Sequence, residues 1–93
     1  MWRVAPGNDP ADVVDLLSTL QSRATGIASW DIGSNAGPPS ENGDPWDGAL
    51  ISDHESWEAL EEYSNHPYHT EVVEKLLPML VARAVVDYER GDA

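Results

Sequence analysis

The chain has no cysteine, few basic residues and no long apolar run. Without cysteine it can form no disulfide, use no thiolate as a nucleophile, and build no cysteine-ligated zinc or iron–sulfur site. Five Lys and Arg stand against 17 Asp and Glu, a formal net charge of -12, which is the wrong sign for a phosphate backbone or an anionic membrane. No segment approaches the roughly 18 apolar residues of a membrane span. We therefore expect no nucleic-acid or membrane partner, and a reduced, cytoplasmic environment.

What the chain does contain is enough for one folded domain. Its 93 residues are 41% apolar and include four Trp, and the apolar positions recur at helix and strand periods, which argues against disorder. A chain this short buries only about two-thirds of its unfolded surface, so its core is thin and a partner subunit would add to it. We expect residues 1–93 to form a single domain.

The apolar periodicity divides the chain into four strands and three helices. The predicted elements are a strand at 1–5, a helix after Asp9 that ends before Gly26, a strand at 27–32, a long hairpin loop at 33–45, a strand at 46–53, a helix after Ser56, a helix at 67–77 and a strand at 83–89. This order is the split βαβ pattern of ferredoxin-like α+β folds. It predicts a βαββαβ subunit with a four-stranded antiparallel sheet in which the first strand is central.

Capping residues define where each helix starts. Asp9 precedes Pro10, which suits the first helical position, and Ser56 is placed to cap the second helix. The residue before a proline avoids helical angles, so His66 is expected to cap the third helix at Pro67. The faces expected to point inward carry Val13, Leu16, Leu17 and Leu20 in the first helix, Trp57, Leu60 and Tyr63 in the second, and Val72, Val73 and Leu76 in the third.

One segment, residues 63–69, combines groups that can do chemistry. His69 lies three and four residues before Val72 and Val73, so it projects from the face that packs on the sheet. Tyr63 ends the apolar face of the preceding helix, and the helix break could bring phenol and imidazole over one pocket. Such an imidazole can move protons near neutrality, while the phenol can polarise a carbonyl. The alternative is a histidine that is only a satisfied core residue.

Metal and cofactor sites have weaker support. His54, His66 and His69 with nearby carboxylates could hold a divalent metal, but no recognised ligand spacing is present. The glycines of residues 33–48 lack the spacing and the lysine of a phosphate loop. We expect no metal and no cofactor. The aromatic residues that could line a pocket are Trp2, Trp30, Trp46 and Trp57.

The last third of the chain resembles the stress-responsive A/B barrel family, also called Dabb. The resemblance is carried by Tyr63, by His66-Pro67-Tyr68-His69, and by residues 71–74, 77–78 and 83–88. Residues 46–53 and 56–60 also resemble the family's strand and following helix. The resemblance implies a ferredoxin-like subunit whose sheet face packs on a second copy, which makes a homodimeric α+β barrel. Most members are linked to stress response or have no assigned reaction.

Some plant relatives in this family are cofactor-free polyketide cyclases. Similarity to them implies that His69 is the acid–base, that Tyr63 helps place the substrate, and that Asp87 on the last strand orients the imidazole. His66 and Trp30 are the expected ligand contacts. Family chains usually begin several residues earlier, with a histidine on the first strand. The resemblance therefore implies a first strand shortened at its N-terminus, or a start upstream of Met1.

Three hypotheses follow from these observations. The first is a homodimer that binds a small apolar or carbonyl-containing ligand between its helices and sheet, with no assigned reaction. The second is a cyclase-like enzyme that performs an aldol-type ring closure with His69 as acid–base. The third is a structural interaction module whose barrel is filled with side chains. We expect the first.

Overall fold

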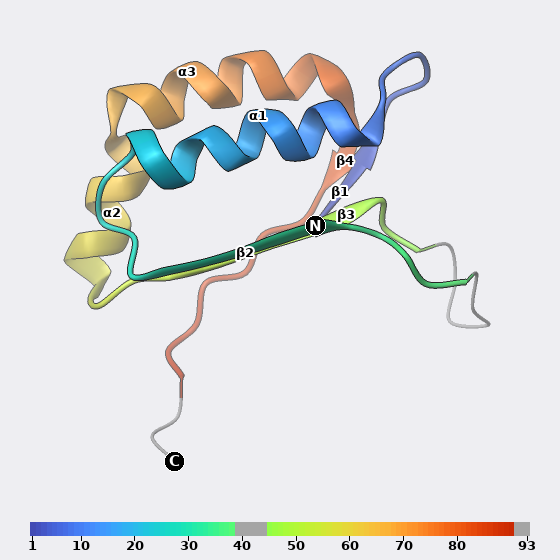
Figure 1. Cartoon of the computed structure of the whole chain (residues 1–93). Helices are drawn as coiled ribbons and strands as arrows, with labels where there is room; N and C mark the ends of the chain where they lie inside the picture. The colour runs from blue at the N-terminus through green and yellow to red at the C-terminus, as the bar shows by residue number, and fades with distance from the viewer. Residues whose placement is uncertain (39–44, 91–93) are drawn as a thin grey trace.

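The computed structural model describes residues 1–38 and 45–90 of the 93. An antiparallel sheet carries the helices on one face, with α1 and α3 side by side above it and α2 at one end (Figure 1). The elements are β1 (Trp2–Val4), α1 (Pro10–Arg23), β2 (Ser29–Ser34), β3 (Gly48–Asp53), α2 (Trp57–Asn65), α3 (Pro67–Leu76), a short 3-10 turn η1 (Leu77–Met79) and β4 (Leu80–Arg83). Of the described helices, none is long and apolar enough to cross a membrane.

The sheet confirms the predicted ferredoxin-like arrangement. Its strand order is β2-β3-β1-β4, so β1 is central, and every pairing is antiparallel. β2 and β3 pair along their whole length, from Ser29 opposite Asp53 to Ser34 opposite Gly48. β1, by contrast, pairs with β3 only where Trp2 lies opposite Gly48. Within the described residues, the rest of β3 therefore has a neighbouring strand on one side only.

The three predicted caps are confirmed. Each capping side chain accepts a hydrogen bond from a backbone N–H in the first turn, which would otherwise lack a partner. The donor–acceptor distances are 2.9 Å for Ala11 and Asp9, 3.0 Å for Ala59 and Ser56, and 3.1 Å for Tyr68 and His66. His66 also ends α2, so a single residue separates the two helices.

Gly26 follows α1 with a φ of 85°, a left-handed conformation that glycine adopts without strain. A Cβ at this position would collide with the carbonyl oxygen of Ala59. The backbone after α1 therefore passes directly against α2, and this close approach brings the start of β2 to the α2 end of the sheet.

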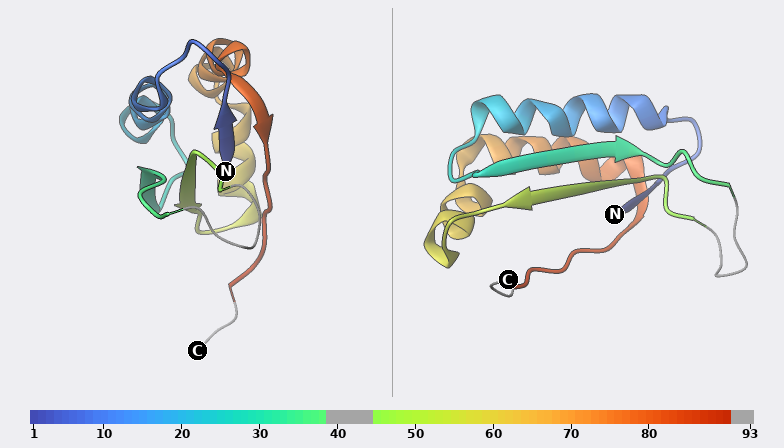
Figure 2. Two further views of the ribbon diagram at one scale, coloured as in Figure 1. Left: turned by 90° about the vertical axis from the view of Figure 1, so that its right-hand side faces the viewer. Right: turned by 60° about the horizontal axis from the view of Figure 1, so that its bottom comes forward.

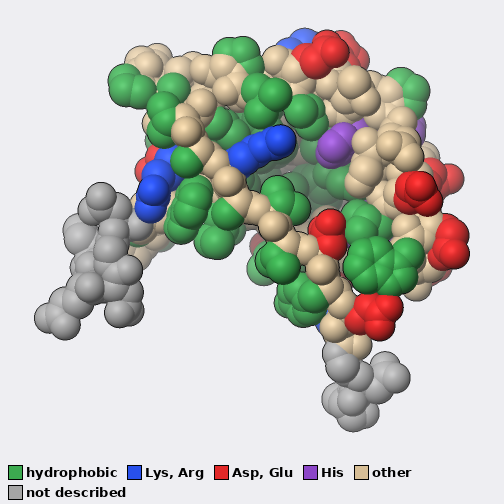
Figure 3. All heavy atoms as spheres, turned by 180° about the vertical axis from the view of Figure 1, so that it is seen from behind, with side chains coloured by type: hydrophobic (Ala, Val, Ile, Leu, Met, Phe, Trp, Pro, Cys, Tyr) green, Lys and Arg blue, Asp and Glu red, His purple; other side chains and the backbone are tan. Residues whose placement is uncertain are grey.

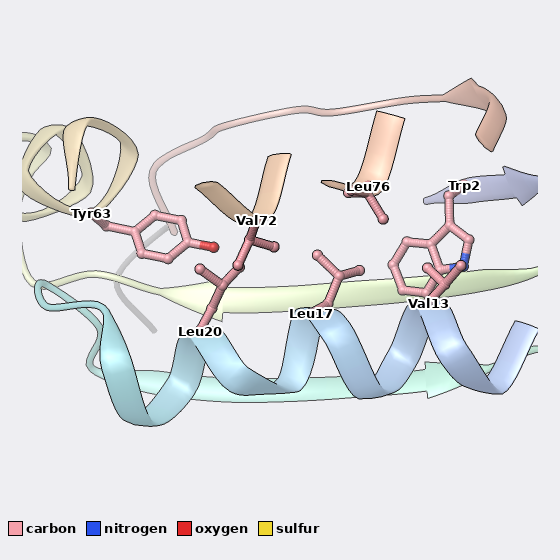
Figure 4. Packing of buried hydrophobic residues seen from close by; sticks show 7 residues of the cluster. All are labelled: Trp2, Val13, Leu17, Leu20, Tyr63, Val72 and Leu76. Atoms are coloured by element: carbon pink, nitrogen blue, oxygen red, sulfur yellow. The ribbon is translucent and has the colours of Figure 1, made fainter. Parts of the chain in front are cut away.

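The core lies between the sheet and the helix layer (Figure 4). Leu20 of α1 lies beside Val72 of α3, and Val13 of α1 lies beside Trp2 of β1 (Figure 4). Val13, Leu20 and Val72 are at most 1% exposed. The other buried apolar residues are Trp2, Leu17, Tyr63 and Leu76. The prediction that Trp57 points inward is wrong, because its side chain is 52% exposed and its indole N–H donates to Glu89 at 2.6 Å.

The last strand differs most from the prediction. β4 spans Leu80–Arg83 instead of residues 83–89, and residues 84–90 leave the sheet and run away from the helix layer (Figures 1 and 2). The Ala84 N–H still donates to the Met1 carbonyl at 2.9 Å. Beyond that point no β1 residue lies alongside. Strand propensity is therefore not realised, because a strand needs a partner to accept its backbone hydrogen bonds.

Three other boundaries shift by one or two residues. The first strand covers 2–4 instead of 1–5, the second 29–34 instead of 27–32, and the third 48–53 instead of 46–53. The predicted loop at 33–45 consequently begins after Ser34, and its residues 39–44 lie outside the described part of the chain. Strand ends are the least determined feature of an apolar pattern, because they depend on how far the neighbouring strand extends.

Candidate functional site

The break between α2 and α3 brings Tyr63 and His69 together, as predicted. Tyr63 is the last inward residue of α2 and is buried, while His69 lies in the first turn of α3 and is half-buried. Their ring centroids are 4.8 Å apart and the rings meet edge to face at 65°. The turn at His66-Pro67 makes this contact possible, because it redirects the chain within one residue.

Tyr63 is also the centre of a larger aromatic cluster. Trp30 of β2 meets it edge to face at 6.3 Å, and the ring of His54 lies 5.1 Å away. Trp30 was predicted to contact a ligand, and the structure places it beside the predicted pair. The site prediction omitted His54. The signal was its position two residues after Ser52, which continues the inward-facing alternation of β3.

The environment of His69 keeps its ring neutral. Burial lowers the pKa of His69 from its ordinary value of 6.5, and the nearby His66 lowers it further. A hydrogen bond to the Ser64 backbone carbonyl partly offsets this effect. A carbonyl can only accept, so one ring nitrogen donates to Ser64 and the other carries the lone pair of the neutral ring. At neutral pH, His69 is therefore able to accept a proton.

Tyr63 has the opposite capacity. Burial raises the pKa of its phenol to about 12, because the charged phenolate is disfavoured away from water. The hydroxyl therefore stays protonated at neutral pH and can donate a hydrogen bond. A neutral base and a phenol donor thus lie in ring contact at one end of the helix layer.

His54 is held by two hydrogen bonds. Its Nδ1 lies 2.5 Å from the Gly26 carbonyl oxygen, and its Nε2 lies 2.9 Å from the Ser52 hydroxyl. Because the carbonyl only accepts, the neutral ring carries its proton on Nδ1. Nε2 must then accept from the Ser52 hydroxyl. The tautomer of His54 follows from its partners.

His66 and Asp87 are placed differently from Tyr63 and His69. His66 uses its Nδ1 to cap α3, and its ring is half-buried. Asp87 is exposed on the segment after β4, outside the strand on which it was expected. The hydrogen bond described for the His69 ring is to a backbone carbonyl, which sequence reasoning did not anticipate.

Among the hollows on the described surface, two are lined by residues outside the aromatic cluster. The larger is an open groove of about 440 Å³ on the sheet face away from the helices, and its lining includes Met1, Trp46, Ala49 and Ile51. A smaller one of about 290 Å³ lies by Gly26 and the start of α2. The surface is also indented between the 84–90 segment and the helix layer, with a histidine at the rim (Figure 3). Within residues 1–38 and 45–90, no cluster of three or more His, Asp or Glu could hold a metal ion.

Comparison with known families agrees with this geometry. The profile of the family described as Stress responsive A/B Barrel Domain matches residues 1–90. The chain belongs to this family. The resemblance inferred from residues 63–88 is thereby confirmed. None of the curated proteins matches the chain significantly.

Solved structures of low sequence identity share the fold. A protein from Arabidopsis thaliana is 21% identical with a TM-score of 0.82, covering 99% of this chain and 91% of that one. A dimeric ferredoxin-like protein of unknown function from Thermobifida fusca is 22% identical with a TM-score of 0.74, covering 90% and 79%. One from Bacteroides fragilis, also described as dimeric, ferredoxin-like and of unknown function, is 23% identical with a TM-score of 0.73, covering 96% and 89%. At these identities, the likeness shows the fold alone.

Proposed function

We propose that this family member is a homodimer that binds a small apolar or carbonyl-containing ligand beside Tyr63 and His69. The observation that carries the proposal is the contact between a neutral imidazole and a protonated phenol at 4.8 Å. Together they offer one donor and one acceptor within an aromatic cluster, which is the composition of many small-molecule sites. We further propose that residues 1–93 act as a single domain, in the cytoplasm and without a cofactor.

The residues around this pair support a ligand with a carbonyl group. The Tyr63 hydroxyl can donate to its oxygen, and the indole N–H of Trp30 is buried without a hydrogen-bond partner among the described residues. Unpaired buried donors are costly, so a ligand that satisfies one gains affinity. His66, at the break between α2 and α3, is proposed as a further contact.

Ligand binding can be tested by titrating the protein with a medium-chain 2-alkanone while following NMR chemical shifts. We expect the largest shifts at Tyr63, His69 and Trp30. Tyr63→Phe should weaken binding several-fold, since it removes one hydrogen bond worth about 1 kcal/mol. Tyr88→Phe is the matched control, because that phenol is exposed on the segment after β4. Equal affinity in both variants would contradict the proposed site.

The homodimer part of the proposal is supported by the sheet face that lacks helices. Ile51 of β3 and Val81 of β4 are 57% and 64% exposed, and they alternate with Leu50 and Leu80, which pack against the core. Exposed apolar patches on a sheet favour association. The two structures from Thermobifida fusca and Bacteroides fragilis, described as dimeric, have the same fold.

Light scattering coupled to size exclusion tests the dimer. The parent chain should elute with the mass of two copies at micromolar concentration, and Ile51→Glu or Val81→Glu should convert it to one copy. Leu77→Glu is the control, because Leu77 is an exposed apolar residue outside the sheet. A parent chain that is monomeric at these concentrations would refute this part of the proposal.

The alternative function is a polyketide-cyclase-like reaction, favoured by the lone pair on the second ring nitrogen of His69. His69 would remove a proton from a carbon next to a carbonyl, and Tyr63 would donate to that oxygen. The Ser64 carbonyl holds the ring N–H, so Asp87 would orient the imidazole, as the resemblance implies, only by replacing that carbonyl. With a linear poly-β-ketone thioester as substrate, His69→Ala should slow ring closure by about 10²-fold to 10⁴-fold while the fold persists. Asp87→Asn should have a smaller effect. Unchanged turnover in His69→Ala would exclude this reaction.

A further inference from the structure

A second histidine site lies on the sheet side of Tyr63 and takes no part in the proposed function. Ser52 lies on the helix-facing side of β3, since it alternates with Leu50, which packs on the core. Its hydroxyl is 2.9 Å from Nε2 of His54, and Nδ1 of the same ring is 2.5 Å from the Gly26 carbonyl. Both Ser52 and His54 are half-buried. The Ser52 hydroxyl therefore contacts the His54 imidazole, and the Gly26 carbonyl orients that imidazole from its other nitrogen.

We propose that Ser52 is a nucleophile, activated by His54, that accepts the acyl group of an activated ester or thioester. The geometry is that of a serine whose proton is taken by a hydrogen-bonded imidazole. In the familiar triads a carboxylate holds the other ring nitrogen. Here the Gly26 carbonyl does so, and the close approach of Gly26 to the Ala59 carbonyl fixes its position.

The backbone of β3 supplies a donor for the acyl oxygen. The Asp53 carbonyl accepts a hydrogen bond from the N–H of Ala28, which directly precedes β2. In an antiparallel pair, alternate residues direct their N–H and C=O groups to opposite neighbours. The Ser52 N–H therefore points to the other edge of β3, where β1 reaches only as far as Gly48. An acyl oxygen bound at that edge can accept from this N–H.

The step balances without a cofactor. The Ser52 oxygen forms a bond to the acyl carbon while its proton passes to Nε2 of His54. The bond to the leaving alcohol or thiol breaks, and that group takes the proton from His54. Water, deprotonated by the same nitrogen, then attacks the acyl carbon. The bond to the Ser52 oxygen breaks, that oxygen takes the proton back from His54, and a carboxylic acid is released.

Acylation with 4-nitrophenyl acetate tests the proposal on the full chain. We expect a burst of nitrophenolate approaching one per chain, and tandem mass spectrometry should locate the acetyl group on Ser52. Ser52→Ala should abolish the burst, and His54→Gln should slow it by about 100-fold or more. Ser29→Ala is the matched control, because the Ser29 hydroxyl donates to the Asp53 carboxylate on the neighbouring strand and has no imidazole partner within residues 1–38 and 45–90.

The label position makes the outcome independent of folding defects in the variants. Acetyl found on Lys75 or the N-terminus, with Ser52 unmodified in the parent chain, would overturn the proposal. So would a burst of equal size in Ser52→Ala, or its loss in Ser29→Ala. None of these results bears on the Tyr63–His69 site, since ligand binding there is followed by NMR and uses no acyl transfer.

Discussion

The two faces of the sheet are built from the same strands but have different surroundings. On the face under α1 and α3, side chains pack against Leu20 and Val72, each 1% exposed. On the opposite face, Ile51 and Val81 are exposed by more than half. Apolar character alone therefore does not decide what is buried. Alternate strand residues that point toward the helices become core, and those that point to the opposite face remain exposed and can contact a second molecule.

The largest expected effect comes from the covered face. Leu20→Ala should lower the free energy of unfolding by about 2–5 kcal/mol, because it leaves a cavity that the surrounding side chains cannot fully fill. Val85→Ala removes methyl groups from the exposed segment after β4 and should change it by no more than about 0.5 kcal/mol. Urea unfolding measures both. Similar losses would mean that residues 84–90 are packed in solution.

Two glycines extend the comparison between packed and open positions. Gly26 and Gly7 have nearly the same φ, 85° and 87°, so alanine at either costs about 1–2 kcal/mol of strain. Only Gly26 also has a backbone carbonyl, that of Ala59, where the Cβ would go, whereas Gly7 faces open space. Gly26→Ala should therefore destabilise the chain more than Gly7→Ala in thermal unfolding. The reverse order would contradict the close approach of Gly26 to α2.

His69, which is half-buried, should make a smaller contribution to stability, and this contribution should depend on pH. Burial lowers the pKa of His69, so below about pH 6.5 the unfolded chain binds more protons than the folded one. The contribution of the neutral ring to stability is present above that pH and is lost as the pH falls. Tyr63, the Ser64 carbonyl and His66 surround the ring, and none supplies a negative charge at neutral pH. In urea unfolding, the parent should lose more stability than His69→Gln between pH 7.5 and 5.5.

The smallest effect is expected at the solvent-facing side of α3. Lys75 and Glu71 form an ion pair at 3.3 Å, with both side chains more than half exposed. Exposed pairs of this kind contribute about 0.3–0.5 kcal/mol. Lys75→Ala should therefore shift the urea midpoint only slightly, and added salt should remove the difference. A loss above about 1 kcal/mol would show that α3 depends on this pair.

Local features of the chain were predictable. Asp9, Ser56 and His66 cap the helices as their types and neighbours indicate, because a cap depends on two or three adjacent residues. The contact between Tyr63 and His69 followed from helix periodicity on each side of one break. These predictions needed no knowledge of distant contacts.

Features that depend on distant partners were not predictable. Residues 84–90 have strand composition but extend past the end of β1. Trp57 has the spacing of a core residue but bonds to Glu89 outside the core. The hydrogen bonds of His54 join it to Gly26, 28 positions earlier in the chain. Each outcome depends on where a remote segment lies.

The sequence by itself determined the order of the elements, the helix starts, the family and the pair of groups at the helix break. Each of these is encoded by neighbours within one or two turns, where backbone preferences and periodicity act directly. The tertiary structure alone decided which sheet face is covered, where the last strand stops, and which groups bond to His54. These depend on contacts between residues far apart in the chain, since a strand or a buried ring needs a partner that no local pattern specifies.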